Sequence, residues 1–253
     1  MHALERISLD AYLPVYGTAA IDVGGATCLR APHAPESPML NRVVGLGVDG
    51  PVDEAQLDDA LTAMGDTSFY VAVSPTAAAS LDALLEARGL EPGWGWMLFE
   101  RGPSSAPSVE TALNIVEVDA GTLDAWATVV ATAYGLPDDS LPWFAAIPGT
   151  TAWHAFLALD GDEPAAAAAV WIDEHAAYFG MAGTVPEHRG KGGQGALFAA
   201  RIERALAAGC TTLVTETGEL RDGSPSSSYR NIRRYGFEER FVVAHRLRPY
   251  RRG

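Results

Sequence analysis

The second half of the chain alternates between short apolar runs and segments of helical character. Six runs have the length and the bounding turn residues of strands, and three longer segments lie between them. The strands are expected at 113–118, 153–159, 165–172, 178–185, 211–215 and 241–247. The helices are expected at 123–134, 194–208 and 227–234. This order predicts an α/β fold with α+β character and a mixed sheet.

A glycine-rich turn follows the run at 178–185 and leads into the helix expected at 194–208. Its four glycines and two cations are Gly190, Gly192, Gly193, Gly195, Arg189 and Lys191. Glycine lets the backbone turn tightly and leaves its N–H groups uncovered. The first turn of the helix adds unpaired N–H groups and the positive end of the helix dipole. The segment therefore predicts an anion site suited to a diphosphate, rather than a surface turn with incidental basic residues.

Residues 189–194 resemble motif A of the GNAT acyltransferase superfamily, which reads (Gln/Arg)-x-x-Gly-x-(Gly/Ala). Gln194 occupies the last position, where the family has a small residue. Downstream, 231–237 resembles the motif B helix with its terminal Gly-Phe. The resemblance covers about residues 110–247, and it implies the GNAT fold and an acetyl-CoA-dependent N-acetyltransferase activity.

The same resemblance implies where acetyl-CoA binds as co-substrate, with no metal. Family members hold the pyrophosphate on the glycine loop and contact the pantetheine arm and the thioester through the preceding strand. The implied cofactor-binding residues are Gly183, Thr184, Val185, Arg189, Gly190, Lys191, Gly192, Gly193, Gln194, Gly195, Ala196 and Asn231.

Two residues are candidates for proton transfer. GNAT enzymes often carry a proton-donating tyrosine four residues before the motif B glycine, where this chain has Ile232. Tyr229, one turn earlier, is the candidate donor, with packing of its ring on the sheet as the alternative. Glu216 follows the strand expected at 211–215 and is the candidate general base if burial raises its pKa. Acceptor binding and a solvated loop carboxylate are the alternatives for Glu216.

The first hundred residues repeat part of the later pattern. Segment 80–101 parallels 228–247 when Gly89 is aligned with Gly236, because each pairs a helix with a closing strand. Segment 42–50 then stands where motif A is expected. The repeat predicts two tandem GNAT-like domains, of which the first is degenerate.

The segment Gly102-Pro-Ser-Ser-Ala-Pro-Ser is small, turn-forming and uncharged, as linkers are. We therefore expect a degenerate N-terminal domain at 1–102, a linker at 103–109 and a GNAT acetyltransferase domain at 110–253.

A second glycine pattern lies in the first half. The stretch Gly45-Leu-Gly47-Val-Asp-Gly50 satisfies the Gly-x-Gly-x-x-Gly dinucleotide pattern. The helix after it opens with Asp53 and Glu54, and carboxylates at that end of a helix repel a pyrophosphate. The charge of this segment disfavours a nucleotide site.

The net charge of −14 is unevenly distributed. Residues 1–188 carry five basic and 26 acidic side chains (net −21), whereas 189–253 carry 13 basic and six acidic ones (net +7). A polyanionic cofactor fits the basic end, and the acidic remainder favours a cationic amine acceptor or simply keeps the protein soluble. An acidic surface of this extent argues against nucleic-acid binding.

Several features bear on location. No stretch approaches the ~20 apolar residues that span a bilayer. Glu5, Arg6 and Asp10 make the first residues unlike a secretory signal. Cys28 and Cys210 stand apart from each other and from metal-ligand patterns, as in a reduced protein. We expect a cytoplasmic protein with no membrane partner.

The functional expectation is an acyl-CoA-dependent N-acyltransferase that moves acetyl from acetyl-CoA to a primary amine by direct attack. The alternative is a non-catalytic CoA-binding or interaction module, which Ile232 at the family's tyrosine position favours. A dinucleotide-binding protein is a more distant third hypothesis.

Overall fold

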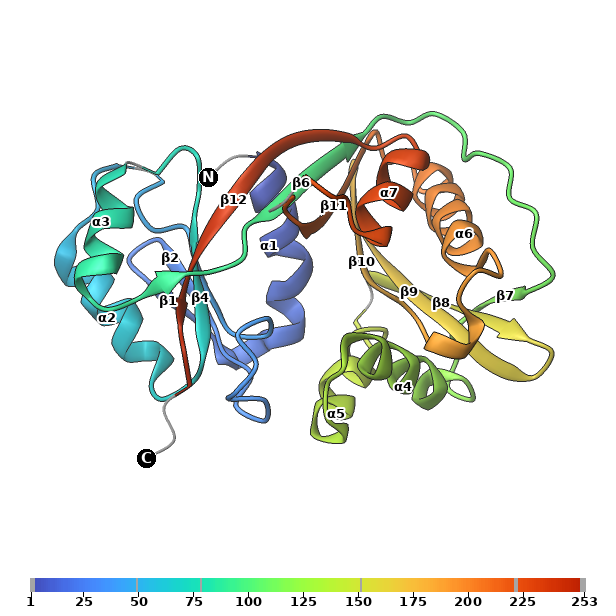
Figure 1. Cartoon of the computed structure of the whole chain (residues 1–253), viewed down its shortest axis with the longest axis horizontal. Coiled ribbons are helices and arrows are strands. Elements are labelled where there is room, and N and C mark those ends of the chain that lie inside the picture. The colour runs from blue at the N-terminus through green and yellow to red at the C-terminus, as the bar shows by residue number, and fades with distance from the viewer. Residues whose placement is uncertain (1–2, 49, 78, 151, 221–222, 251–253) are drawn as a thin grey trace. The chain divides into compact units, whose positions relative to one another are not determined.

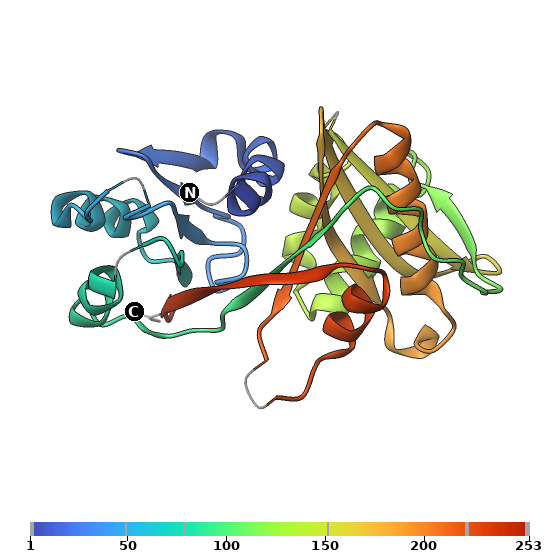
Figure 2. The ribbon, with the colours of Figure 1, turned by 90° about the horizontal axis from the view of Figure 1, so that it is seen from above.

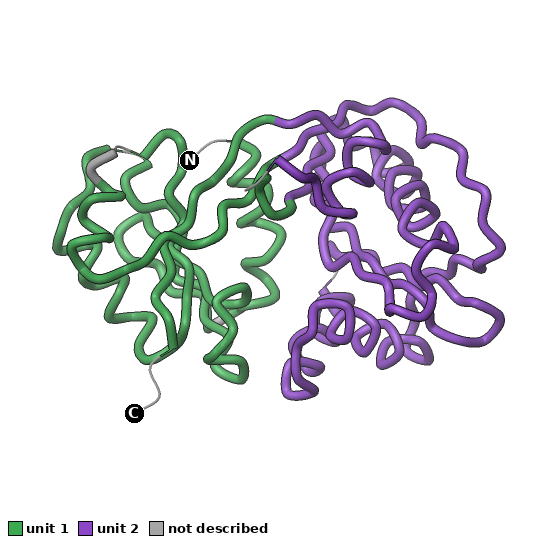
Figure 3. The backbone as a smooth tube through the Cα atoms, viewed as in Figure 1, with its two compact units in different colours: residues 1–98, 217–222, 240–253 green, residues 99–216, 223–239 purple. Residues whose placement is uncertain are grey.

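The computed structural model describes residues 3–48, 50–77, 79–150, 152–220 and 223–250. They form two units (Figure 3). Unit 1 contains 1–98, 217–222 and 240–253, and unit 2 contains 99–216 and 223–239. Three strands, β6 (Trp96–Arg101), β11 (Thr212–Gly218) and β12 (Glu238–Arg248), therefore contribute residues to both units. The functional division at 103–109 stays a prediction.

Unit 2 is built on the strand order β11-β10-β9-β8-β7 (Figure 1). Strands β7 to β10 pair antiparallel, and β10 pairs parallel with β11. All nine elements expected after residue 110 are present. They are β7 (Asn114–Glu117), α4 (Leu123–Tyr134), β8 (Trp153–Asp160), β9 (Glu163–Asp173), β10 (Ala176–Thr184), α6 (Gly193–Ala207), β11, α7 (Ser227–Arg234) and β12. Helix α5 (Leu141–Ala146), which follows a 3₁₀ turn at Asp138–Ser140, was not expected.

Strand β9 explains how helices pack on both faces of this sheet. Its residues 165–170 are five alanines and a valine, and all are fully buried. Small side chains let helices approach closely on either side. Helices α4 and α6 lie on opposite faces in both views (Figures 1 and 2). Trp126 of α4 and Phe198 of α6 are among the buried side chains that complete the two cores.

Unit 1 has the strand order β1-β2-β3-β4-β12, with β5 beside β12. Strand β3 runs parallel to β4, and β12 pairs antiparallel with β4 from Ala244 to Arg248. Its elements are α1 (Ala3–Tyr16), a 3₁₀ turn (Gly17–Ala19), β1 (Ala20–Val23), β2 (Ala26–Leu29), β3 (Arg42–Val44), α2 (Glu54–Met64), β4 (Phe69–Val73), α3 (Ala79–Ala87), β5 (Glu91–Pro92) and β6.

The two units repeat one order of elements. In unit 1 a strand, a glycine turn and a helix (β3, 45–50, α2) lead to a parallel strand and a second helix. In unit 2 the same order runs through β10, α6, β11 and α7. This confirms the prediction of two tandem domains of one fold. Among the described residues, no helix is both long enough and apolar enough to cross a membrane.

Candidate functional site

Strand β10 carries a β-bulge near its C-terminal end. The pairing with β9 is regular up to Gly180 and Ala169, and it resumes at Gly183 and Ala167. Two residues of β10 therefore lie opposite Ala168 alone, which is the arrangement of a bulge. One of them, Met181, has a φ of 50°, a left-handed conformation that costs energy for a side chain of this size.

Two side chains fill the gap that the bulge leaves in the strand ladder. The Trp126 indole, from α4, donates to the Ala168 carbonyl at 3.2 Å. The Arg201 guanidinium, from α6, donates through Nη1 to the carbonyls of Ala169 and Gly180 at 3.3 and 3.5 Å. Because the two helices lie on opposite faces, the bulge is held from both sides.

Arg201 is an unusual residue for this position. It is 1% exposed, and its guanidinium lies over the rings of Phe179 and Phe198. Burial lowers the pKa of Arg201, yet a guanidinium stays protonated in proteins. Its Nη2 has no hydrogen-bond partner in the part of the chain that the structure describes. The core of unit 2 therefore contains a buried positive charge beside the bulge.

Beyond Phe179 and Thr215 the parallel pairing of β10 and β11 ends, although both strands continue. Glu216 is the next residue on β11. The Tyr178 hydroxyl of β10 donates to Glu216 Oε1 at 2.9 Å. A hydrogen bond of this kind orients the carboxylate. The predicted general base thus stands where the two strands part.

The glycine turn joins β10 to α6. Gly192 is the N-cap residue, with a left-handed φ of 84°, and no side chain caps the helix. Its first turn contains no acidic residue. The N–H groups and the positive end of the dipole are thus free of a competing carboxylate from the helix itself, as an anion site requires.

Gln194, which replaces a small residue of motif A, is directed toward β10. Its Nε2 donates to the Gly183 carbonyl at 2.8 Å and to Thr184 Oγ1 at 3.1 Å. The side chain therefore ties the first turn of α6 to the end of β10. The next residue, Val185, is tied to β9, since its N–H donates to the Ala165 carbonyl.

Internal packing accounts for several of the glycines. A Cβ on Gly192 would lie 3.2 Å from the Glu110 carbonyl oxygen, and one on Gly195 would lie 2.1 Å from the Tyr235 hydroxyl. Gly193 is similarly close to Leu113. By contrast, Gly190 has open space beside it at a φ of 84°. The turn therefore needs glycine for its own folding as well as for any ligand.

The cations of the turn differ in their surroundings. Lys191 Nζ is bound to the carboxylate of Asp160, the last residue of β8. His188 Nδ1 also lies 3.0 Å from that carboxylate. Hydrogen bonds from Lys191 and His188 lower the pKa of Asp160. Arg189 is exposed. One cation is thus engaged by a carboxylate and the other extends into solvent.

Motif B forms helix α7, and its two key positions point into the core. Tyr229 is 1% exposed and packs edge-on against Phe99, with ring centroids 5.0 Å apart. Burial and, secondarily, Glu239 raise the pKa of Tyr229 to about 12. Ile232 is also buried. Ala196 on α6 is buried and Asn231 is half-buried.

The structure brings some predicted residues into contact and adds others. Gly183, Thr184 and Gln194 meet at the junction of β10 and α6, and Glu216 meets Tyr178. The sequence reasoning missed Tyr178 and Arg201. The signal for Arg201 was a charged residue on the apolar face of a helix. No group of three or more His, Cys, Asp and Glu side chains is placed to hold a metal within the described ranges.

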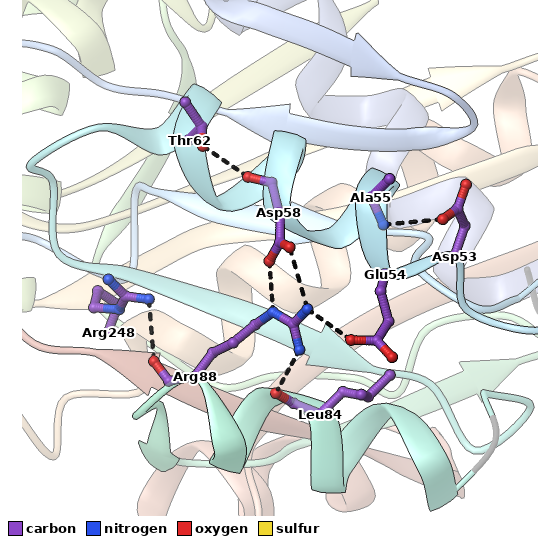
Figure 4. A network of polar contacts seen from close by, with 8 residues as sticks. All are labelled: Asp53, Glu54, Ala55, Asp58, Thr62, Leu84, Arg88 and Arg248. Atoms are coloured by element: carbon purple, nitrogen blue, oxygen red, sulfur yellow. Dashed lines mark hydrogen bonds and ion pairs between the residues drawn. The ribbon is translucent and has the colours of Figure 1, made fainter.

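In unit 1, carboxylates lie at and near the start of the helix that follows the corresponding glycine turn (Figure 4). Asp53 caps α2 by accepting from the Ala55 N–H at 2.9 Å. Arg88 then binds Asp58 at 2.6 Å and Glu54 at 3.1 Å. Hydrogen bonding to Arg88 lowers the pKa of Asp58. Asp53 and Glu54 thus place two carboxylates at the N-terminal end of α2.

No protein-family model and no curated protein matches the chain. Solved structures do match it. A GCN5-related N-acetyltransferase from Sphaerobacter thermophilus is 15% identical with a TM-score of 0.67, over 90% of this chain and 77% of that one. One from Kribbella flavida is 21% identical with a TM-score of 0.66, over 98% and 96%.

A tandem GNAT protein from the clavulanic acid biosynthesis pathway is 16% identical with a TM-score of 0.64, over 98% of this chain and 89% of that one. These matches extend over both units of the chain. They agree with the repeated order of strands and helices and with the two parallel strand pairs. The chain has the fold of the GCN5-related N-acetyltransferases, in a tandem arrangement.

Proposed function

We propose that the protein transfers an acetyl group from acetyl-CoA to a primary amine and that unit 2 carries the reaction. The observation that carries this proposal is the position of Glu216. It lies where β10 and β11 part, on the strand next to the one that leads into the uncapped α6. A base and a free helix N-terminus on adjacent strands suit a reaction between an amine and a diphosphate-bearing thioester.

For the cofactor, we infer that the pyrophosphate binds at the glycine turn and the N-terminus of α6. The absence of acidic residues from the first turn of α6 supports this assignment. Arg189 is exposed and extends the positive potential. Lys191 joins it once its bond to Asp160 opens. Gly183, Thr184 and Val185 line the path of the pantetheine arm, and Asn231 belongs to the same proposed site.

For the chemistry, the neutral amine attacks the thioester carbonyl directly. Glu216 accepts the proton that the amine nitrogen loses, and the hydrogen bond from Tyr178 keeps its carboxylate aligned. The electron pair of the breaking C–S bond leaves with the sulfur. The family's tyrosine position holds Ile232, and the nearby candidate donor Tyr229 is buried against Phe99.

The acidic residues that dominate 1–188 favour an amine acceptor that carries additional positive charge. The second candidate function is a CoA-binding module without catalysis. The buried Ile232 at the tyrosine position favours it.

Release of free thiol from acetyl-CoA in the presence of a panel of amines tests the proposal. The full chain is expected to release thiol with at least one primary amine, and Glu216→Gln is expected to abolish most of that release. Binding of CoA without thiol release from any amine in the panel would favour the non-catalytic module.

A further inference from the structure

Because the family's tyrosine position holds Ile232, it offers no hydroxyl group to protonate the departing sulfur. Unit 2 has four tyrosines in its described part. Three of them are at most 5% exposed and are engaged in the core: Tyr178 on Glu216, Tyr229 on Phe99 and Tyr235 stacked on Phe198. Tyr134 differs, because it is 38% exposed. Among these four, Tyr134 is the one whose side chain is partly open to solvent.

Helix α4 delivers Tyr134 to the bulge of β10. Tyr134 is the last residue of α4, which ends there because Gly135 adopts a left-handed φ of 65° and its N–H bonds back to the helix. The preceding residue, Ala133, lies directly on Gly183. A Cβ on Gly183 would be 2.2 Å from the Cβ of Ala133. This close approach fixes the end of α4 beside the last residues of β10.

The surroundings of the Tyr134 hydroxyl combine a donor and a cation. The Tyr134 ring lies against Phe144, with centroids 6.3 Å apart, and the side chain as a whole is 38% exposed although its hydroxyl is buried. There the backbone N–H of Ala182, one of the two bulge residues, donates to it. The buried charge of Arg201 acts on the same oxygen.

We propose that Tyr134 is the proton donor to the departing sulfur of CoA, a role that rests on the proposed acetyl transfer. Tyr134, at the end of α4, supplies the proton-donating hydroxyl, because the motif B helix offers only Ile232 and the buried Tyr229. The bulge supplies the rest of the arrangement, because Ala182 and Arg201 both favour negative charge on the tyrosine oxygen.

When the C–S bond breaks, its electron pair stays on sulfur, and the O–H proton of Tyr134 moves to that sulfur to give the free thiol. The oxygen of Tyr134 holds the negative charge that results. The proton that Glu216 takes from the amine nitrogen then returns to Tyr134 through solvent. The products are the N-acetylated amine and CoA, with every protein group back in its starting state.

The protonation state of Tyr134 agrees with this role. Burial raises its pKa to about 12, and the Ala182 N–H and Arg201 oppose that increase. The hydroxyl is therefore protonated at neutral pH, and burial makes it a weaker acid than an ordinary tyrosine.

The test is a pH titration of the thiol of CoA bound to the full-length protein, followed by thiolate absorbance. We compare the unmodified protein with Tyr134→Phe and, as the matched control, with Tyr229→Phe, since each substitution removes one hydroxyl and keeps the ring. A hydrogen bond to the charged form lowers a pKa, so Tyr134→Phe is expected to raise the thiol pKa by roughly one unit. Tyr229→Phe is expected to leave it unchanged.

Turnover provides the second reading. Tyr134→Phe is expected to lower kcat roughly 10- to 100-fold, at the low end for a positioned acid because a thiolate leaves readily, with the KM for acetyl-CoA nearly unchanged. An equal thiol pKa in the unmodified protein and Tyr134→Phe would overturn the assignment, and so would a shift confined to Tyr229→Phe. Absence of CoA binding to the unmodified protein would instead overturn the proposed function.

Discussion

Each unit places a glycine turn between a strand and a helix, and the two turns differ in the residues at the start of that helix. In unit 1 the helix begins after Asp53, whose carboxylate takes the Ala55 N–H, and Glu54 occupies its first turn. In unit 2 the helix begins after Gly192, with no side-chain cap and no acid in its first turn. One fold thus presents an occupied and a free helix N-terminus.

A glycine pattern by itself therefore does not identify an anion site. Gly45 and Gly47 in unit 1 and Gly190 and Gly192 in unit 2 all adopt positive φ angles. What separates the two turns is the charge at the start of the following helix and the neighbouring strand. Strand β11 carries Glu216 beside Tyr178, whereas β4 is followed by Ser74, which is bound to Glu5.

The largest effect on activity is expected from a substitution of Glu216 on β11. Glu216→Gln keeps the shape of the side chain and removes its basicity, so kcat is expected to fall roughly 10²–10⁴-fold with CoA affinity intact. Steady-state kinetics and calorimetry measure the two quantities. A loss confined to KM would mean that Glu216 only positions the amine.

Next in size is the effect of a side chain at the turn. In Gly192→Val, a β-branched residue would stand at a φ of 84°, and its Cβ would lie 3.2 Å from the Glu110 carbonyl oxygen. The turn must shift, and acetyl-CoA affinity is expected to fall at least tenfold or so, the equivalent of about 1.4 kcal/mol. Calorimetry on the folded variant measures it.

The matched control is Gly47→Val in unit 1. Its φ is 68°, and its Cβ would lie 2.7 Å from Val52. This variant is expected to lose stability and to bind acetyl-CoA like the unmodified protein. Reduced affinity in Gly47→Val with retained affinity in Gly192→Val would reverse the comparison.

A smaller effect is expected from the carboxylate that engages Lys191. Asp160→Asn removes a negative charge near the proposed pyrophosphate and frees the lysine. Acetyl-CoA affinity is expected to rise roughly two- to fivefold, in line with one screened charge interaction in water. Asp162→Asn, in the same turn, serves as the control for net charge. Weaker binding by Asp160→Asn alone would show that Asp160 holds Lys191 in its binding position.

The smallest effect is expected in unit 1. Asp53→Ala removes the cap of α2 and is expected to destabilise the protein by about 1 kcal/mol, a typical cost of losing an N-cap. The affinity for acetyl-CoA is expected to stay the same, because the unit 1 helix takes no part in binding. Thermal unfolding with and without acetyl-CoA measures both. A gain of affinity would mean that the carboxylate alone had kept a phosphate out.

The sequence predicted the order of elements well because that order depends on local patterns. Helices α4 and α7 begin and end at the predicted residues, and each strand expected after residue 110 is present. Local pattern failed where partners lie far apart in the chain. Strand β12 pairs with β4 across about 170 residues, which a contiguous division into 1–102 and 110–253 does not anticipate.

The candidate site was predicted in part for the same reason. The uncapped turn before α6 follows from its glycines, and Glu216 follows from its place after an apolar strand. The bulge at Met181 does not follow from any local preference, since it arises from the packing of α4 and α6 against β9 and β10. The partners of Arg201 and Tyr134 depend on that packing, and so they became visible only in three dimensions.

Hydrogen exchange of the full-length protein with and without acetyl-CoA shows which of the two glycine turns binds the cofactor. Backbone amides are the proposed ligands in unit 2, so peptides that cover 185–200 are expected to exchange more slowly with acetyl-CoA present. Peptides that cover 43–58 in unit 1 are expected to exchange at the same rate in both conditions. Protection of 43–58 with none at 185–200 would contradict the account.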